Sequence, residues 1–471
     1  MRSTARDAAR AAAHATVELA DIQGLVRSNF RTLPSACFSV FTLGDPAGAR
    51  RFLRHLAAEV TSAAARDART ATQVALSAAG LRSLALPEHI LGQFSHEFQE
   101  GIATPNRSRF LGDVPSAWTW GAPGSARPEV LVCTYARTEA ELDEALTEVQ
   151  DAATECGVTS ARELFSRQLS EFEPFGFRDG ISDPYVPELS STAQAADPPQ
   201  VAPVALGEFV LGYRNSYGAF GQRPVLTADQ DPGGLLPVLP PGVDPRCPGG
   251  GADLGRNGSF LVLRTLEQDV EGFVEWINSQ AKFYGIDPHL LGAKLVGRWP
   301  SGAPVTLSPD RDRPELAYAN DFGYHHDDPL GRGCPIGAHV RRANPRDSLD
   351  PRPGSAQSLA ITDRHRILRR GRTFASPDGS QGLQFVALNA NLARQFEFIQ
   401  HSWLDNPKFG GLYDDVDALV GSRTPRSVFT MPDLPLRRRF TGLPEFVTPR
   451  GGEYFFLPGL RALRFLAREP R

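Results

Sequence analysis

The sequence has few of the features that mark disulfide-rich, zinc-binding or membrane proteins. It contains five cysteines, which are scattered along 471 residues, and no two of them are spaced as CxxC. Neither a disulfide framework nor a zinc site is therefore expected, and each cysteine is better interpreted as a small buried apolar residue. No run of about 18 apolar residues occurs, so no transmembrane helix is expected.

A strong charge of either sign is also missing. The chain has 50 Lys and Arg against 54 Asp and Glu, a net charge of −4. Nucleic-acid-binding domains usually have a basic excess, so nucleic acid is excluded as the main partner. The N-terminus is rich in Ala and Arg, but it lacks the apolar stretch of a signal peptide and an Arg-Arg pair. Because Asp7, Glu18 and Asp21 also argue against a transit peptide, we expect a cytoplasmic protein with no membrane contact.

The length of the chain favours two domains over a single compact core. Its hydrophobic content of 41% and charged content of 22% are typical of a globular protein. One stretch rich in Ser, Ala and Pro is a plausible linker, and a second stretch, 226–258, is a long loop rich in Pro and Gly. We predict an N-terminal extension over 1–20, an N-terminal domain over 21–188, a linker over 189–206 and a C-terminal domain over 207–471.

Each half of the chain contains strands that are followed by helices. In the first half, Cys37–Leu43 and Val130–Tyr135 predict strands, and Thr138 with Glu141 forms a capping-box pattern. In the second half, Phe260–Leu263 and Gly382–Leu388 predict strands. Helical spacing of apolar residues follows each of these four strands, at Phe52, Leu53, Leu56 and Val60, at Leu142, Leu146 and Val149, at Leu266, Val270, Phe273 and Ile277, and at Leu392, Phe396, Ile399 and Trp403. The repeated order of elements predicts an α+β sandwich built twice.

The segment FGFRDGISDP places Asp179 between Gly176 and Gly180. The flanking glycines allow backbone shapes that other residues resist, so this carboxylate could approach a ligand closely. The segment alone is more typical of a turn in which Asp179 bonds its own backbone.

Two further segments combine histidine with arginine. In CPIGAHVRRANPRD, His339 is followed by Arg341, Arg342 and Arg346. Cationic neighbours favour the neutral, metal-binding form of an imidazole, and arginines can bind carboxylates. A structural histidine beside a solvated basic face would look the same. The segment HRILRRGRTF contains Arg366, Arg369, Arg370 and Arg372, and such basic runs are usually solvated.

Taken together and in this order, the three segments resemble the dye-decolourising peroxidases. GFRDG resembles the GxxDG motif of that family, CPIGAHVRRANPR its proximal-histidine segment and ILRRG its distal-arginine segment. The resemblance covers nearly the whole chain, and the long loop suggests one of the longer subgroups. Four other segments support it, namely DIQG at 21–24, GEFVLGY at 207–213, LVGRWPSGAP at 295–304 and QFEFIQ at 395–400.

The resemblance implies two ferredoxin-like domains, each an antiparallel sheet packed with helices, with haem b mostly in the C-terminal one. Because the chain has no CxxCH, the haem would be bound non-covalently. His339 would be the iron ligand, Asp179 would move a proton on hydrogen peroxide, and Arg369 would stabilise the departing oxygen. The implied reaction reduces hydrogen peroxide and oxidises dyes, phenolics or similar small aromatic donors through a high-valent iron-oxo intermediate.

The resemblance also implies a set of cofactor contacts. Arg341 and Arg342 would contact the haem, Leu383 and Phe385 would line the distal pocket, and Asp417 would bond the far nitrogen of His339. Because adjacent residues of an extended segment face opposite sides, only one of Arg369 and Arg370 can face the haem, and the resemblance implies that it is Arg369. The rival ligands are His325, His326 and His365, the rival carboxylates are Asp414 and Asp415, and the candidate electron relays are Trp276, Trp299, Trp403, Tyr318 and Tyr413.

Two other functions remain open. The chain could be a haem-handling or iron-releasing protein of the same fold, or a cofactor-free ferredoxin-like binding protein. Turnover of a dye with peroxide separates the first alternative from a peroxidase, and a Soret band separates the second. The sequence also leaves open a homo-oligomer.

Overall fold

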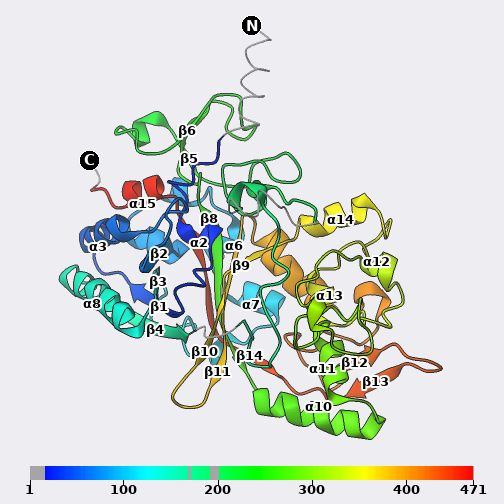
Figure 1. The fold of residues 1–471 in the computed structure, drawn as a ribbon. Helices are drawn as coiled ribbons and strands as arrows, with labels where there is room; N and C mark the ends of the chain where they lie inside the picture. The colour runs from blue at the N-terminus through cyan, green and yellow to red at the C-terminus, as the bar shows by residue number, and fades with distance from the viewer. Residues whose placement is uncertain (1–15, 168–170, 191–200, 470–471) are drawn as a thin grey trace.

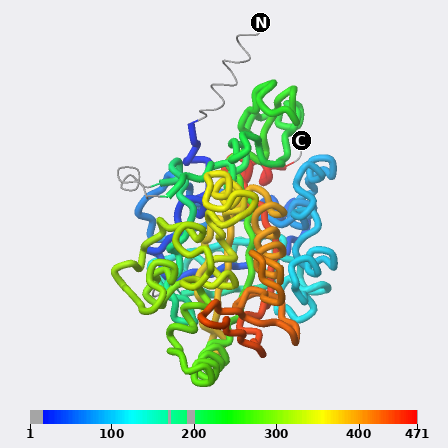
Figure 2. The backbone as a smooth tube through the Cα atoms, turned by 90° about the vertical axis from the view of Figure 1, so that its right-hand side faces the viewer, coloured from blue at the N-terminus to red at the C-terminus, as the bar shows by residue number. Residues whose placement is uncertain are grey.

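The computed structural model describes residues 16–167, 171–190 and 201–469. The predicted N-terminal extension and the predicted linker therefore lie partly outside the described residues. Strands run through the centre of the molecule in Figure 1, with α3, α8 and α15 on one side and α10 to α14 on the other. Figure 2 turns the second group of helices towards the viewer. None of the helices in the described part of the chain is long and apolar enough to cross a membrane.

The first half forms a βαββαβ unit. Its strands pair antiparallel in the order β2-β3-β1-β4, which is the order of a ferredoxin-like sheet. The elements are α2 (Gly24–Arg27), β1 (Ser35–Thr42), α3 (Pro46–Glu59), β2 (Thr70–Leu76), α4 (Ala78–Ser83), α5 (Glu88–Leu91), α6 (His96–Glu100), α7 (Pro105–Leu111), β3 (Val130–Ala136), α8 (Glu139–Glu155) and β4 (Thr159–Arg167).

The second half repeats this order with longer connections. Its strands pair antiparallel in the order β10-β11-β8-β14, and β9 adds to β11. The main elements are β8 (Ser259–Gln268), α10 (Val270–Tyr284), α11 (Pro288–Val296), α12 (Tyr324–Asp327), α13 (His339–Ala343), α14 (Ala356–Asp363), β9 (Leu368–Arg369), β10 (Arg372–Ala375), β11 (Gln381–Asn389), the π-helical turns η6 (Ala393–Glu397) and η7 (Ile399–Leu404), β12 (Val428–Met431), β13 (Arg438–Thr441), β14 (Val447–Leu457) and α15 (Leu460–Leu466).

The two halves join in one nine-stranded sheet, through a pairing of Phe456 in β14 with Leu76 in β2. The outer strands also meet, because Ser166 in β4 donates a hydrogen bond of 2.6 Å to the carbonyl of Thr373 in β10. Since both halves have the ferredoxin-like strand order, the predicted fold class is confirmed. The boundaries proposed around 189–206 stay a prediction.

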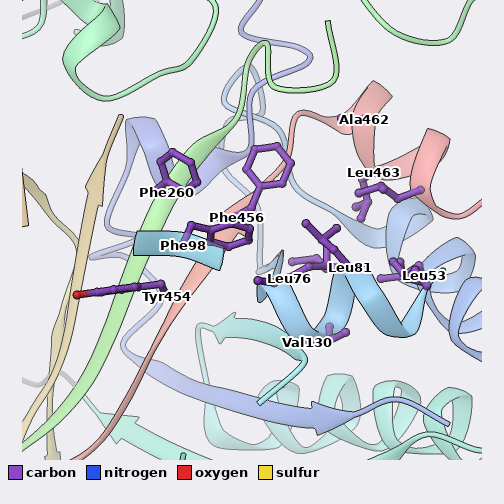
Figure 3. Close-up of a cluster of buried hydrophobic side chains, with 14 of the residues drawn as sticks. Leu53, Leu76, Leu81, Phe98, Val130, Phe260, Tyr454, Phe456, Ala462 and Leu463 are labelled. Carbon is purple, nitrogen blue, oxygen red and sulfur yellow. The ribbon is translucent and has the colours of Figure 1, made fainter. Parts of the chain in front are cut away.

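The core between the sheet and the first helical layer is made by both halves. Leu53 of α3, Phe260 of β8, Phe456 of β14 and Leu463 of α15 are all fully buried in one cluster (Figure 3). The last helix therefore packs on α3, and the end of the chain completes the helical layer of the first half.

Most of the predicted strands and helices are present. The strands predicted at Cys37–Leu43 and Gly382–Leu388 are β1 and β11, and the capping box of α8 is formed by Thr138 with Glu141. The helix predicted to include Leu266 begins later, because Leu266 belongs to β8 and Asp269 caps α10.

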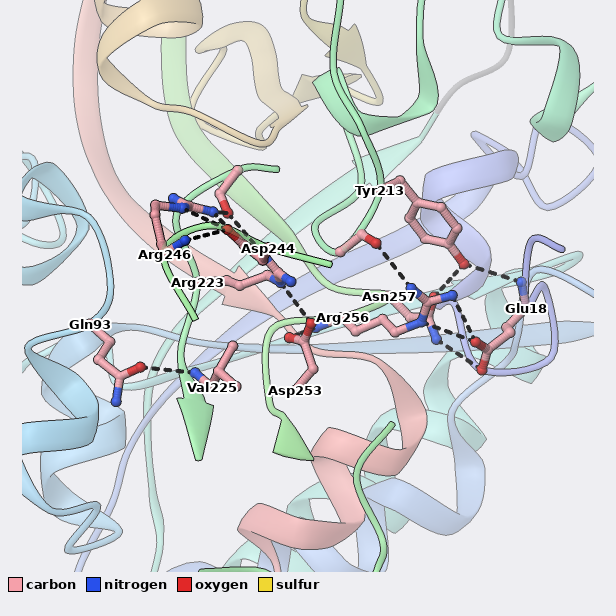
Figure 4. Close-up of polar contacts among 12 residues, drawn as sticks. Glu18, Gln93, Tyr213, Arg223, Val225, Asp244, Arg246, Asp253, Arg256 and Asn257 are labelled. Atoms are coloured by element: carbon pink, nitrogen blue, oxygen red, sulfur yellow. Dashed lines mark hydrogen bonds and ion pairs between the residues drawn. The ribbon is translucent and has the colours of Figure 1, made fainter. Parts of the chain in front are cut away.

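The loop rich in Pro and Gly folds into a small sheet of β5 (Val225–Leu226), β6 (Val238–Leu239) and β7 (Gly251–Asp253). Buried Arg223 holds it, with Nε 2.7 Å from Asp253 and Nη1 2.8 Å from Asp244 (Figure 4). None of these residues lines the cavity described next, so the loop is set apart from the candidate site.

Candidate active site

A cavity of 310 Å³ lies against the sheet of the second half. Because alternate residues of a strand face the same side, β8, β11 and β14 present Leu266, Leu383, Phe385 and Val447 to it. Further apolar residues come from α13, η7 and the segment after η7, namely Val340, Ile399, Leu404 and Leu419. The walls are thus largely apolar. The structure brings the predicted residues Leu383 and Phe385 to this cavity.

His339 begins α13 and lines the cavity. Its Nδ1 lies 3.0 Å from Oδ2 of Asp417, so the predicted hydrogen bond is present. Asp417 is fully buried, and its Oδ1 accepts the backbone N–H groups of Leu419 and Val420 at 2.9 Å each. These contacts fix the carboxylate and the ring, and they leave Nε2 as the imidazole atom for a ligand.

Asp417 and His339 shift each other's pKa. Burial alone would raise the pKa of Asp417, but the neighbouring imidazole and the backbone N–H donors lower it to about 2. Burial would lower the pKa of His339, but Asp417 outweighs burial and the pKa is raised. The carboxylate is therefore ionised, and it makes the imidazole electron-rich.

Asp179 and Arg369 form an ion pair on the cavity wall, with Nη1 of Arg369 2.7 Å from Oδ1 of Asp179. The backbone N–H of Gly180 also donates to Oδ1, at 2.6 Å. Burial would raise the pKa of Asp179, but Arg369 and Gly180 more than compensate, so the pKa lies below its usual value. The side chain of Asp179 is 47% exposed because it borders the open cavity.

Arg370 points away from the cavity, as the alternation of side chains predicts. Its Nε donates to the carbonyl of Leu25 at 2.8 Å, and its Nη2 donates to the carbonyl of Val26 at 3.0 Å. Arg370 therefore attaches β9 to the first half of the chain, whereas Arg369 faces the site.

The prediction that Arg341 and Arg342 contact a cofactor is corrected by the structure, because neither lines the cavity. Arg341 donates to the carbonyl of Cys334 at 2.7 Å and pairs with Asp328 at 3.3 Å. Arg342 donates to backbone carbonyls, among them that of Trp403 at 2.6 Å. Both guanidinium groups are thus committed to holding α13 in place.

Three other arginines, Arg298, Arg346 and Arg366, line the cavity instead. Burial, together with nearby Arg346, lowers the pKa of Arg298 to about 10, and burial also lowers the pKa of Arg366 to about 10. These depressed pKa values indicate that nearby negative groups do not fully compensate the positive charge of the two arginines. Such a site suits an anionic ligand. Arg346 lies in the histidine segment and Arg366 in the arginine segment, but composition does not tell which arginine of a run faces inward.

The rival residues have other roles. The ring of His365 stacks on Phe398, and neither His325 nor His326 lines the cavity. Asp414 pairs with Arg439, and Asp415 accepts hydrogen bonds from Thr430. None of the five candidate relays, Trp276, Trp299, Trp403, Tyr318 and Tyr413, lines the cavity, and their role stays a prediction.

The arrangement has the groups that a haem pocket needs. The cavity has apolar walls, one imidazole that is hydrogen-bonded to a carboxylate, and cationic residues that suit the acidic groups of a ligand. It also contains an aspartate–arginine pair that is close enough to His339 to affect the pKa of the imidazole. Within the described residues, no cluster of three or more His, Cys, Asp or Glu side chains could hold a metal ion.

Comparisons with known proteins agree with this assignment. No protein-family model matches the chain. Peroxidase 2 of Mycetinis scorodonius is 29% identical over 98% of this chain and 90% of its own length. The dye-decolorizing peroxidase AauDyP1 of Auricularia auricula-judae is 28% identical over 90% of this chain and 82% of its own. A solved dye-decolorizing peroxidase in complex with 2,6-dimethoxyphenol has a TM-score of 0.77 at 25% identity, covering 96% of this chain and 100% of that one. By these similarities, which extend over nearly the whole chain, the protein is a haem peroxidase of the dye-decolourising type.

Proposed function

We propose that the chain binds haem b without covalent links, with His339 as the iron ligand, and uses hydrogen peroxide to oxidise dyes, phenolics and similar small aromatic donors. The observation that carries the proposal is that one apolar cavity is lined both by His339, backed by Asp417, and by the Asp179–Arg369 pair.

The residues present fit a haem. Apolar side chains suit the porphyrin plane, and Arg298, Arg346 and Arg366 suit its carboxylate groups. Asp417 accepts the Nδ1 proton of His339, which leaves the Nε2 lone pair for iron. No cysteine is among the cavity-lining residues of the described chain, which supports non-covalent binding.

When bound, haem supplies the iron that takes up the oxidising equivalents of peroxide. The low pKa of Asp179 keeps its carboxylate ionised, so Oδ can take the proton of the inner peroxide oxygen and pass it to the outer one. The guanidinium of Arg369 stabilises the negative charge on the departing oxygen. Leu383 and Phe385 limit access of bulk water to this part of the cavity.

Phenols are supported as reducing substrates by the relative that was solved with 2,6-dimethoxyphenol. The cytoplasmic location, which was expected from the sequence, stays a prediction, and a homo-oligomer stays open.

The test is turnover by the haem-reconstituted protein. With hydrogen peroxide and 2,6-dimethoxyphenol, we expect coloured product, and Asp179→Asn should lower the rate of the peroxide step by about 10²- to 10⁴-fold. A haem-loaded protein that does not turn over but releases iron would support the haem-handling alternative. A protein that binds no haem would support the cofactor-free alternative.

A further inference from the structure

The segment that carries Asp179 is a short hairpin whose inner side is occupied by a carboxylate. Phe172 pairs with Arg178 in an antiparallel bridge, and the N–H of Asp179 donates to the carbonyl of Glu171 at 2.8 Å. The N–H of Glu173 donates to the carbonyl of Phe177 at 2.9 Å. The position of Asp179 therefore follows from the position of this hairpin.

The side chain of Glu173 accepts three hydrogen bonds. Its Oε1 accepts the N–H of Phe177 at 3.0 Å, and its Oε2 accepts the N–H of Phe175 at 3.0 Å. The third donor is Nε2 of Gln268, at 2.8 Å. Gln268 is the last residue of β8, and it lines the same cavity as Leu266. Glu173 thus closes the hairpin and attaches it to the strand that forms the cavity wall.

Glu173 is not explained by pairing with a cation. No Lys, Arg or His forms an ion pair with it among the residues that the structure describes. Burial raises its pKa, while Gln268 and the two backbone N–H groups oppose that shift. A partly buried carboxylate without a counter-charge lowers the stability of the fold. The position of Glu173 in the cavity wall is therefore better explained by a function than by stability.

We infer that Glu173 is a positioning residue for the peroxide step, which holds the hairpin against β8 so that Asp179 meets Arg369. This inference rests on the proposed acid–base role of Asp179. Three donors converge on Glu173, and only an ionised carboxylate accepts from all of them without presenting a donor of its own.

The isosteric change Glu173→Gln isolates this function. The amide would present N–H to one of the two backbone donors, and that donor would lose its acceptor even if Gln268 turned its own amide. The hairpin would then shift. Because a displacement of roughly 1 Å can cost about 100-fold in rate, we expect the peroxide step to slow by about 10- to 100-fold.

The experiment uses stopped-flow mixing of the haem-loaded protein with peroxide. Glu173→Gln should slow the reaction but should leave the affinity of the haem iron for imidazole unchanged, since imidazole binding needs no proton transfer. Glu267→Gln is the matched control, because Glu267 is the adjacent residue of β8 and pairs with Arg450 at 2.8 Å. This control should react at the wild-type rate.

A double-mutant cycle separates positioning from general damage to the fold. In an Asp179→Asn background, Glu173→Gln should cause little further loss, because the group that it positions is gone. The same factor in both backgrounds, or a wild-type rate for Glu173→Gln, would overturn the inference. If Glu173→Gln fails to load haem, Gln268→Met removes only the anchoring donor and should show the same non-additive loss. A fast Asp179→Asn variant would overturn the acid–base role and this inference together, whereas a slow Asp179→Asn with a fast Glu173→Gln would overturn this inference alone.

Discussion

Two aspartates serve the cavity, and their partners decide what each can do. Asp417 is fully buried and accepts hydrogen bonds from His339 and from two backbone N–H groups, so it has no free position for a substrate. Asp179 borders the open cavity and shares only Oδ1 with Arg369 and Gly180. The first is suited to hold a ligand in place, and the second to exchange a proton.

Replacing Asp417 should weaken cofactor binding. Without its acceptor, the His339 ring loses both its orientation and its electron-rich character, and such partners are typically worth 10- to 100-fold in affinity, so we expect about that loss for Asp417→Ala. The transfer of haem to apomyoglobin measures it. Asp414→Ala is the control, since Asp414 pairs with Arg439 instead. Equal loss rates for wild type and Asp417→Ala would contradict the assignment.

Arg369 and Arg370 should differ sharply when each is changed to Leu. Arg369→Leu removes the cation beside Asp179 and should slow the peroxide step by about 10²- to 10³-fold. Arg370→Leu removes donors to the carbonyls of Leu25 and Val26, so it should lower the unfolding temperature and leave the rate near wild type. Stopped-flow rates and thermal melts test both. Equal kinetic losses would mean that the orientation of β9 is wrong.

The pH dependence of the peroxide step should follow the ionisation of Asp179. The group must be a carboxylate to accept a proton, so the rate is present above its pKa and is lost as the pH falls through it. Since Arg369 and Gly180 hold that pKa below 3.8, the acid limb should lie below pH 3.8. Arg369→Leu should move the limb to higher pH, because burial then acts without the cation. A limb that stays in place in this variant would remove Asp179 as its source.

The strand wall behind the cavity depends on a close approach of β11 to β8. A Cβ on Gly382 would come within 2.0 Å of the carbonyl oxygen of Leu266 and 2.9 Å of the Cα of Glu267. Gly382→Ala should therefore push the strands apart next to Leu383, lower the free energy of unfolding by about 1–3 kcal/mol and perturb the haem spectrum. Gly249→Ala is the control, because nothing lies within 4 Å of its added Cβ. Urea unfolding of both variants measures the difference.

The sequence is informative where a strand or helix has a regular apolar pattern. CFSVFTL and GLQFVAL contain such patterns, and both form strands. β14 could not be predicted in this way, because VTPRGGEYFFL contains Pro449, Gly451 and Gly452, which usually mark turns. Gly451 is required there for packing, since an added Cβ would come within 2.2 Å of Nε1 of Trp120.

The sequence motifs predicted only part of the candidate site. His339, Asp179 and Arg369 share the cavity, and Asp417 bonds His339, although it lies 78 positions away in the chain. The cationic contacts were not predictable, because which arginine faces inward depends on the path of the backbone after α13. Glu173 has no pattern of its own, and only the fold shows what its carboxylate accepts.

The contact between the two halves contains a partly buried carboxylate. Oε1 of Glu453 in β14 accepts the N–H of Ile102, from the first half, at 3.3 Å and that of Tyr454 at 2.8 Å. Burial raises the pKa of Glu453 from 4.5 to about 7, and the two N–H groups compensate only in part. Folding therefore favours the protonated form of Glu453. The stability that this preference contributes is complete below pH 4.5 and is lost as the pH rises to about 7.

Glu453→Gln should remove that dependence. At pH 8 the variant should be more stable than wild type by about 1–2 kcal/mol, a figure reduced because the side chain is partly exposed, and at pH 4 the two should be equal. The midpoint of urea unfolding at the two pH values measures this. A stability difference that does not change with pH would contradict the raised pKa.

The most direct test of the whole account is the absorption spectrum of the purified protein after incubation with haem, compared between wild type and His339→Ala. The account predicts a Soret band and stoichiometric haem in the wild type, and little or no bound haem in His339→Ala. His365→Ala, which alters a histidine stacked on Phe398 outside the cavity wall, should bind haem like the wild type. Full haem loading of His339→Ala with an unchanged low-temperature EPR spectrum would contradict the central claim.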